Sequence, residues 1–272
     1  MSQPTRPAQQ EDIFRLWPAV KAAHLMTSAE EFSAFRDAAP WRVRVNEAGE
    51  ALVLAQWRGH LNVLAIRGLW SAPHHLGDLV DDACAVARAQ GFARVLSPLI
   101  TGDACDAYLA IGMSEVERIV ALQGAVGDVI AHRLPAGARI RSANSADLPA
   151  LARLDEGCFN EFWRYGAVEL ADSLGRERVT VVETHEGAIE GYSTCACYGA
   201  TVTVGRLAVA PAARRHGVGR ALLSDVASWA QRSGAYALTL CTQEANAASR
   251  ALYAVTGLVE LPERYLLAMR CV

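Results

Sequence analysis

The sequence predicts an α/β protein built from two copies of one unit with a mixed sheet. Three observations predict this fold class: 52% of the 272 residues are apolar, strand-like and helix-like hydrophobic periods alternate, and several local patterns recur at an offset of 135 residues or slightly more. A chain of this length can bury a large core but exceeds the usual size of a single domain. We therefore expect two domains, each with a central sheet flanked by helices.

The repeat is clearest at the start of each copy. Residues 6–16 and 141–151 share the pattern Arg-x-Ala-x-x-x-Asp-(Ile/Leu)-x-x-Leu, at an offset of 135 residues. Each copy of this pattern predicts a short strand, a turn, and a helix that begins at an Asx-type cap with leucine on its inner face.

Later segments repeat as well, with an offset that grows along the chain. The widening places insertions in loops, where a chain tolerates them best. We expect the copies to join near residues 130–137, which predicts domains at 1–132 and 137–272. The further pairs are 68–73 with 206–211, 89–95 with 232–238, and 107–113 with 252–258.

The hydrophobic pattern of the second copy predicts one long helix among several strands. The helix, at about residues 217–233, places Val218, Leu222, Val226 and Trp229 on one stripe, which should pack on the sheet. Hairpin strands together with separated strand-helix-strand units imply a mixed sheet with helices on both faces. Strand-like runs occur at 138–141, 178–183, 188–198, 201–209, 236–242 and 265–270.

Charge and hydropathy argue against several classes of partner. The formal net charge is −3, so the chain lacks the broad basic field that supplies most nucleic-acid affinity. The first ten residues contain no apolar run typical of a secretory leader, and no apolar stretch reaches 18 residues. We expect a soluble cytoplasmic protein that binds neither nucleic acid nor membranes; its oligomeric state is left open.

The seven cysteines predict reduced thiols and no metal site. Their number is odd, no Cys-x-x-Cys pair is present, and no histidine cluster lies beside them. Cys195 and Cys197 could hold a soft metal. In a strand, however, they would share a face with small apolar residues, so packing is the favoured interpretation.

The residues that point to chemistry lie between the strand at 203–209 and the long helix. Pro211 ends strand pairing, and Gly217 and Gly219 then bracket the start of the helix. A helix N-terminus leaves backbone N–H groups without partners at the positive end of the macrodipole, so consecutive amides can cradle a pyrophosphate. The glycines let the backbone approach a phosphate and adopt positive φ. Cationic donors come from Arg214, Arg215 and Arg220.

This loop and a second block together resemble the GNAT family of N-acetyltransferases. The loop, 214–220, reads Arg-Arg-His-Gly-Val-Gly-Arg after a Val/Leu-rich strand and Pro211, and it opens an Ala-Leu-Leu helix. The block at 246–258 is similar to the family segment Asn-x-x-Ala-x-x-Leu-Tyr-x-x-x-Gly-Phe. Neither a dinucleotide-binding Gly-x-Gly-x-x-Gly directly after a strand nor a Walker Gly-Lys-Ser/Thr is present. The resemblance covers about residues 137–272 and implies two tandem GNAT-like domains.

The resemblance implies acetyl-CoA as the acyl donor and direct attack by an amine on its thioester. In this family a splayed strand offers backbone N–H groups to the cofactor. The resemblance implies that Leu207, Ala208 and Val209 make these contacts here. Asn246 would hydrogen-bond the pantetheine arm or mark the start of its helix. Tyr253 would protonate the departing thiolate, with a buried core tyrosine as the alternative. The pyrophosphate would lie against Arg214, Arg215, His216, Gly217, Val218, Gly219 and Arg220.

The acceptor predicted from the resemblance is a primary amine, either of a small molecule or of a protein N-terminus. The family places its acceptor loop after the first helix, which here corresponds to residues 155–165. Glu161, Trp163 and Tyr165 in that segment combine a carboxylate with aromatic rings, a mixture that suits a cationic amine. A cap over the hydrophobic core is the alternative interpretation of the same residues.

No residue is assigned as the general base. In the related ribosomal-protein alanine acetyltransferases, a glutamate lies five residues before the Asn block, where this chain has Cys241. A thiol with an ordinary pKa of about 8.5 would serve only if its surroundings lowered that value. The remaining candidates are Glu156, Glu161, Glu183, Tyr192 and Glu244.

The counterpart loop of the first copy, residues 73–82, lacks the features of a phosphate site. One glycine remains, but three aspartates bring negative charge and the arginines are absent. His74 and His75 could indicate a metal, but adjacent side chains diverge, so a solvated turn is favoured. We interpret the first copy as degenerate and the second as active. If the missing base reflects lost chemistry, the chain would instead be a non-catalytic acyl-CoA sensor.

Overall fold

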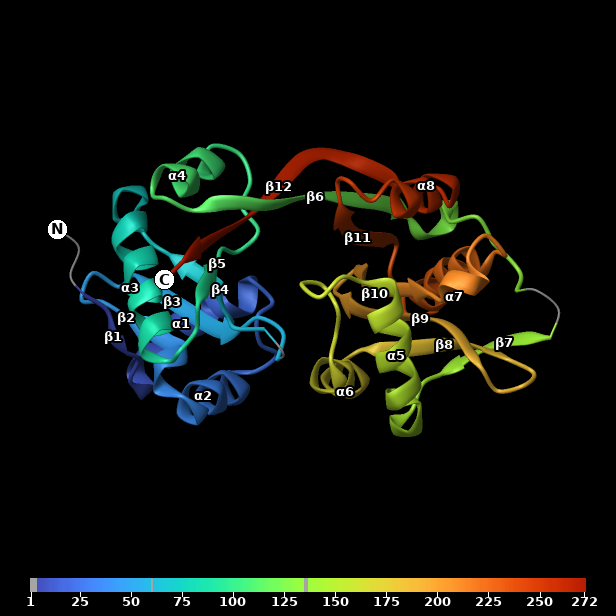
Figure 1. Ribbon diagram of the computed structural model, residues 1–272, viewed down its shortest axis with the longest axis horizontal. Helices are drawn as coiled ribbons and strands as arrows, with labels where there is room; N and C mark the ends of the chain where they lie inside the picture. Colours follow the sequence, from blue (N-terminus) through green and yellow to red (C-terminus); the bar gives the residue numbers. More distant parts are fainter. Residues whose placement is uncertain (1–3, 60, 135–136) are drawn as a thin grey trace. The chain divides into compact units, whose positions relative to one another are not determined.

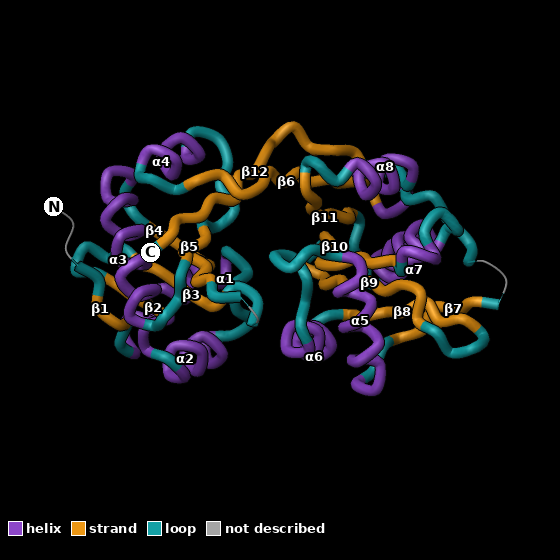
Figure 2. The backbone as a smooth tube through the Cα atoms, viewed as in Figure 1, coloured by secondary structure: helices purple, strands orange, loops and turns teal. Residues whose placement is uncertain are grey.

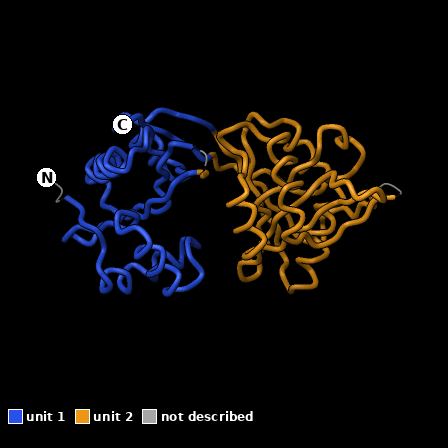
Figure 3. Tube along the Cα trace, turned by 60° about the horizontal axis from the view of Figure 1, so that its bottom comes forward, with its two compact units in different colours: residues 1–57, 61–117, 265–272 blue, residues 58–60, 118–264 orange. Residues whose placement is uncertain are grey.

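The computed structural model describes residues 4–59, 61–134 and 137–272 and contains a mixed sheet of twelve strands flanked by helices (Figure 1, Figure 2). The chain divides into two compact units (Figure 3). The first unit contains residues 1–57, 61–117 and 265–272, and the second contains residues 58–60 and 118–264. The predicted fold class, a mixed α/β sheet with flanking helices, is confirmed.

The first unit contains strands in the hydrogen-bonded order β1-β2-β3-β4-β5-β12. Helices α1 and α2 pack on one face of these strands, and α3 packs on the other. The bounds of its strands are Arg6–Pro7 (β1), Val43–Val45 (β2), Ala51–Gln56 (β3), Val63–Trp70 (β4) and Arg94–Leu96 (β5). Its helices are Gln10–Ala22 (α1), Ala29–Ala38 (α2), Leu76–Ala89 (α3) and Ala104–Ala110 (α4).

The second unit repeats this arrangement in the order β6-β11-β10-β9-β8-β7. The predicted strand positions agree with the observed ones to within two residues, except that the last strand begins earlier than expected. These strands are Ser114–Ala125 (β6), Ala138–Ser142 (β7), Arg178–Thr184 (β8), Ile189–Tyr198 (β9), Thr201–Val209 (β10) and Ala237–Gln243 (β11); the last strand of the chain, Val259–Cys271 (β12), is the one that stands beside β5 in the order of the first unit. The helices are Leu148–Cys158 (α5), Ala167–Arg176 (α6), Val218–Arg232 (α7) and Ala247–Val255 (α8).

Successive residues of β8 and β9 divide the core of the second unit into two layers. Val181 and Tyr192 face α5 and α6, whereas Val182 and Cys195 lie on the side of α7. On α7, Val218, Leu222 and Val226 of the predicted apolar stripe are buried, and Trp229 is partly buried against the same core. Helices therefore cover both faces of the sheet in this unit, as expected.

The same ion pair organises the start of both repeats. Arg6 contacts Asp12 at 2.7 Å, and Arg141 contacts Asp147 at 2.7 Å. In each repeat the aspartate also accepts the backbone N–H of the residue three positions before it, which caps the helix that follows. This shared geometry confirms that residues 6–16 and 141–151 are structural counterparts.

In the strand order of each unit, the sixth strand comes from the other repeat. The end of β12 pairs with β5 in the first unit, with Met269 opposite Leu96. Strand β6 pairs with β11 in the second unit, with Ala125 opposite Ala237. Each compact unit thus contains residues from both predicted domains. The predicted bounds, 1–132 and 137–272, describe the two copies of the repeat and stay a prediction. The expected junction at 130–137 includes residues 135–136, which lie outside the described residues.

All seven cysteines are free thiols. Cys195, on β9, is buried against α7, while Cys197, on the same strand, is exposed. Among the described residues, no group of three or more His, Cys, Asp or Glu side chains is placed to hold a metal ion. No helix within the same ranges combines the length and the apolar character needed to cross a bilayer.

The exchanged strand β12 should contribute measurably to the stability of the first unit. Leu266 is 2% exposed and packs in the core beside α3, whereas Val259 on the same strand is 68% exposed. We expect Leu266→Ala to lower the free energy of unfolding by about 2–5 kcal/mol, because it removes buried apolar volume. Val259→Ala should change it by less than about 0.5 kcal/mol. Urea denaturation followed by circular dichroism measures both, and equal effects would contradict the assignment.

Candidate functional site

Two parallel strands part at the place where the sequence predicts a cofactor. The β10–β11 ladder runs from Thr201 opposite Ala237 to Val204 opposite Leu240, and β10 then continues to Val209 paired with β9. A bulge in the pairing with β9 occurs at the same level, between Val204 and Arg206. The backbone of residues 205–209 therefore has an edge that the ladder with β11 does not use.

The loop that follows β10 has an unusual backbone. Gly217 has φ of 88° and Arg215 has φ of 70°, so two positions of the turn are left-handed. An ideal Cβ on Gly217 would lie 2.3 Å from Nε2 of His132, which makes glycine the residue that fits there. Gly217 is also the N-cap of α7 and provides no side-chain cap. The first turn of α7 thus keeps N–H groups available for an anion.

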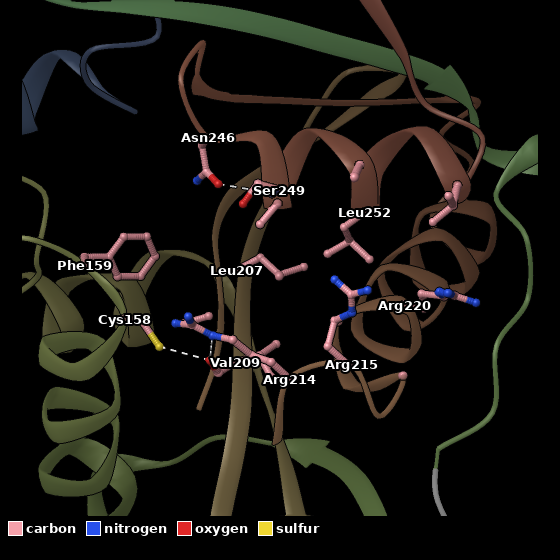
Figure 4. Close-up of a pocket in the computed structure, with 16 residues that line it drawn as sticks. Cys158, Phe159, Leu207, Val209, Arg214, Arg215, Arg220, Asn246, Ser249 and Leu252 are labelled. Atoms are coloured by element: carbon pink, nitrogen blue, oxygen red, sulfur yellow. Dashed lines mark hydrogen bonds between the residues drawn. The ribbon is translucent and has the colours of Figure 1, made fainter. Parts of the chain in front are cut away.

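A pocket of about 480 Å³ lies between the end of β10, the start of α7 and helix α8. Figure 4 shows α8 along one side of it, with Asn246, Ser249 and Leu252. The end of α5 contributes Cys158 and Phe159 from another side. The pocket therefore joins the strand edge to the cationic loop.

Nine of the eleven predicted cofactor residues line this pocket. His216 is exposed outside it, and Val218 is 1% exposed in the core under α7, where it anchors the helix. The nine are Leu207, Ala208, Val209, Arg214, Arg215, Gly217, Gly219, Arg220 and Asn246.

Other lining residues were missed by sequence reasoning. Three of them, Ser249, Leu252 and Val255, follow from helical geometry, because they continue from Asn246 in steps of three along one face of α8. Cys158 lies at the end of α5, where its thiol donates to the carbonyl oxygen of Val209 at 3.2 Å, and Nε of Arg214 donates to the same oxygen at 3.1 Å. Burial raises the pKa of the Cys158 thiol, although Arg214 acts in the opposite direction. The missed residues are Cys158, Phe159, Ala248, Ser249, Ala251, Leu252 and Val255.

Asn246 and Tyr253 lie on the same helix in different environments. Oδ1 of Asn246 accepts the backbone N–H of Ser249 at 3.1 Å, so Asn246 caps α8 while it lines the pocket. Tyr253 is 6% exposed, packs in the core and is not among the lining residues. Burial raises the pKa of Tyr253 to about 12, while a hydrogen bond with Ser249 acts in the opposite direction. Its phenol therefore stays protonated at neutral pH.

The three predicted acceptor residues lie outside the pocket lining. Glu161 is exposed, and Trp163 packs edge to face against Phe162 with ring centroids 5.3 Å apart. Tyr165 is half-buried, and its ring lies under the guanidinium groups of Arg58 and Arg206, at 4.4 and 4.0 Å. Internal cations thus already occupy the aromatic surface of Tyr165, and its part in acceptor binding stays a prediction.

Two candidates for the general base are engaged elsewhere. Arg141 and Arg139 hydrogen-bond Glu183 and lower its pKa to about 2, which makes it a weak base at neutral pH. The Tyr192 hydroxyl donates to Asp155, and burial together with that carboxylate raises the pKa of Tyr192 well above its ordinary value. A phenol in this state donates a proton and does not accept one.

The other candidates for the base also lie outside the pocket lining. Glu156 and Glu244 each pair with an arginine, at 3.0 and 2.9 Å, and Glu161 is exposed. Around Cys241, desolvation by neighbouring groups raises the pKa of the thiol, the opposite of what a thiolate base requires. The identity of the base therefore stays open among these residues.

A buried ion pair lies next to the pocket and was not predicted. The guanidinium of Arg206 binds both carboxylate oxygens of Asp155, at 2.7 and 2.8 Å, with side-chain exposures of 7% and 0%. Tyr192 and the backbone N–H of Tyr165 complete the hydrogen bonds to Asp155, the latter at 2.6 Å. Burial by itself would lower the pKa of Arg206, but the bonds and charge of Asp155 raise it. The sequence feature that could have indicated this pair is Arg206 itself, the one charged residue in the otherwise apolar and small residues of β10.

The counterpart loop in the first unit is bound by the chain's own carboxylate. Oε1 of Glu50 accepts the backbone N–H of Ala72 at 3.0 Å and lies 2.8 Å from Nδ1 of His75. Glu50 is 7% exposed, and its second oxygen accepts from Asn46. A fixed negative charge therefore lies beside residues 73–82, and it would repel a phosphate.

Comparisons with known proteins agree with the predicted family. Residues 148–258 match the model of the acetyltransferase (GNAT) family. No curated protein matches the sequence significantly. The matched range contains the Arg214–Arg220 loop and all of the residues that line the pocket.

Solved structures share the fold. A tandem GNAT protein from the clavulanic acid biosynthesis pathway is 16% identical over 84% of this chain and 82% of its own, with a TM-score of 0.66. A GCN5-related N-acetyltransferase from Sphaerobacter thermophilus is 19% identical over 98% and 95%, also at 0.66. The ribosomal-protein-S18-alanine N-acetyltransferase from Escherichia coli is 23% identical over 50% and 94%, at 0.43. The first two confirm the tandem GNAT-like fold predicted from the sequence.

Removing one partner of the buried Asp155–Arg206 pair should lower the stability of the protein strongly. Asp155→Ala leaves the guanidinium of Arg206 buried without its counter-charge, which we expect to lower the free energy of unfolding by about 3–5 kcal/mol. Glu156→Ala, at the next position, removes an exposed pair with Arg164 and should cost less than about 1 kcal/mol. Urea denaturation compares the two, and a loss below about 1 kcal/mol for Asp155→Ala would refute the account.

Proposed function

Since residues 148–258 form a domain of the acetyltransferase (GNAT) family, we propose that the second unit is an acetyl-CoA-dependent N-acetyltransferase. The observation that supports this most is the continuity of the pocket. It begins at the strand edge left by the parting of β10 and β11 and ends at a helix start with three arginines. A thioester joined to a pyrophosphate through a long flexible arm needs both features in one cavity.

The cationic end of the pocket fits the pyrophosphate of the donor. Arg214, Arg215 and Arg220 line it, and the left-handed turn at Arg215 and Gly217 exposes consecutive backbone N–H groups. Charge-assisted hydrogen bonds from guanidinium to phosphate are short and strong. We propose that these residues hold the pyrophosphate and that residues 207–209 hydrogen-bond the pantetheine arm through the backbone.

The open edge of β10 fits the thioester end. In direct transfer, the amine nitrogen attacks the thioester carbonyl carbon and negative charge develops on the carbonyl oxygen. Backbone N–H groups along residues 207–209 that point to the edge unused by β11 would stabilise this charge. Successive N–H groups of a strand point to opposite sides, so the others pair with β9. The C–S bond then breaks, and the acyl group stays on the nitrogen.

Tyr253 is the proposed proton donor to the departing thiolate. Its phenol is protonated at neutral pH, and its hydrogen-bond partner Ser249 lines the pocket, which gives a route from the buried hydroxyl to the leaving group. The ammonium formed on the acceptor must lose its proton to a group still to be identified. Among the acceptors that fit this chemistry are small primary amines and protein N-termini.

The two repeats differ in what they offer an anion. The loop of the second unit presents arginines, whereas the loop of the first presents aspartates beside the fixed carboxylate of Glu50. Phosphate binding is therefore favoured in one repeat and opposed in the other. We propose that the second repeat is active and that the first is degenerate.

Acetyl-CoA binding should depend on the arginine at the start of α7. Arg220→Ala removes a charged donor from the pocket and should weaken binding about tenfold or more. Arg232→Ala, in the last turn of the same helix and outside the lining residues, should leave the affinity unchanged. Isothermal titration calorimetry with acetyl-CoA measures both. Equal affinities in the two variants would contradict the placement of the pyrophosphate.

Turnover should depend on the Tyr253 hydroxyl. Tyr253→Phe should lower kcat about 100-fold or more because the thiolate loses its proton donor, with little change in acetyl-CoA affinity. Tyr108→Phe is the matched control, since Tyr108 is the counterpart in the first repeat, is 5% exposed and also has a pKa of about 12. Release of free CoA thiol, measured with a panel of amines, reports the rate.

The same panel distinguishes an enzyme from an acyl-CoA sensor. Tight binding of acetyl-CoA with no amine acetylated would favour the non-catalytic sensor. Turnover that persists in Tyr253→Phe would retain the enzyme but overturn the assignment of the acid.

A further inference from the structure

The loop between β3 and β4 belongs to the second unit although it connects two strands of the first. Arg58 and Gly59 belong to the same compact unit as residues 118–134 and 137–264. The backbone N–H of Gly59 donates to Oε1 of Glu169, on α6, at 2.7 Å. The guanidinium carbon of Arg58 lies 4.4 Å from the ring centroid of Tyr165. The first repeat therefore supplies one contact to the segment between α5 and α6 and one to the first turn of α6.

Arg58 is the first of four side chains that contact one another in series, and the last of them lines the pocket. The Tyr165 ring also lies 4.0 Å from the guanidinium carbon of Arg206, which in turn lies 3.5 Å from the centroid of Phe159. Phe159 lines the pocket. Arg58, Tyr165, Arg206 and Phe159 thus alternate cation and ring, and we call these four residues the cation–ring row.

Each cation of the row has a carboxylate nearby. Asp155 binds Arg206 and also accepts the backbone N–H of Tyr165. Glu169 lies on the side of Arg58, where it accepts the N–H groups of Gly59 and Gly166. The negative charges of Asp155 and Glu169 reduce the repulsion between the guanidinium groups of Arg206 and Arg58, which both contact the Tyr165 ring. Burial lowers the pKa of Arg58, which reflects removal from water, and desolvated cation–π contacts are the stronger ones.

We propose that Arg58, from the first repeat, is a positioning residue for the acceptor loop of the second unit. By holding Tyr165, it keeps residues 159–165 in the conformation that places Phe159 on the pocket wall. The acceptor part of this inference rests on the proposed N-acetyltransferase function, while the ordering of the loop does not. The degenerate repeat then has a role in the active site that requires no ligand of its own.

The proposal is supported by how the C-terminal end of this segment is attached. Residues 159–166 form no helix or strand. The N–H groups of Trp163 and Arg164 donate to Asn160 within the segment, whereas those of Tyr165 and Gly166 donate to the carboxylates of Asp155 and Glu169. Those two carboxylates are the ones that accompany Arg206 and Arg58. Removal of Arg58 should therefore loosen both ties.

Hydrogen–deuterium exchange on the full chain tests the ordering of the loop without any substrate. We expect Arg58→Ala to accelerate exchange in peptides covering residues 159–166 by about threefold to tenfold, the range set by the strength of a cation–π contact. Arg42→Ala is the matched control, since Arg42 lies over Phe35 at 4.8 Å in the first unit. It should leave exchange at 159–166 unchanged.

A second pair of variants guards against a general loss of stability. In a Tyr165→Leu background, the further change Arg58→Ala should have no added effect on exchange at 159–166, because the shared contact is already gone. Acceleration across the whole second unit in Arg58→Ala, or no acceleration at 159–166, would overturn the proposal. Additive effects of the two substitutions would overturn it as well.

The acceptor part is tested with the amine that the enzyme turns over. Arg58→Ala should raise KM for the amine about fivefold or more and leave acetyl-CoA affinity within about twofold of the parent protein. An unchanged KM alongside faster exchange at 159–166 would overturn the acceptor part. If no amine is acetylated by the parent protein, the proposed function fails, while the exchange experiment still decides whether Arg58 orders the loop.

Discussion

The parting of β10 from β11 after Val204 and Leu240 is the constraint on which the candidate site depends. If the parallel ladder continued, the backbone of residues 205–209 would be hydrogen-bonded on both sides and the pocket would close. On its other side, β10 is held by β9, which packs closely against α7. An ideal Cβ on Gly191 in β9 would meet Val218 at 2.9 Å and the carbonyl oxygen of Ala208 at 3.0 Å, so the absence of a side chain lets α7 approach.

Local patterns in the sequence predict what depends on local physics. The 3.6-residue stripe on α7, the strands that alternate between two core layers, and the Arg-x-Ala-x-x-x-Asp pattern at both helix starts all have counterparts in the structure. The turn at Gly217 is also local, because its left-handed backbone, with φ of 88°, favours glycine. Pocket residues on and beside these elements could therefore be named before the fold was known.

What sequence reasoning missed depends on partners far apart in the chain. Asp155 and Arg206 are separated by 51 positions, and neither flank of either residue indicates the other. The same holds for the loop at Arg58, whose partner Tyr165 lies in the other repeat. Tyr165 illustrates the effect on function: its ring was expected to face an ammonium substrate, and two guanidinium groups of the protein lie over it. Aromatic and charged residues close in sequence therefore indicate recognition only when groups from elsewhere in the chain do not already engage them.

The exchange of the sixth strands has a consequence for how the molecule is made. A nascent chain usually folds its N-terminal domain first, as synthesis proceeds. Here β12, which pairs with β5 and buries Leu266 in the core of the first unit, is synthesised only after β7 to β11 of the second. Strand β6, in contrast, is ready before the strands it will join. During synthesis the strands of the first unit are therefore complete except for β12, whereas β6 is already present when its partner in the second unit, β11, emerges.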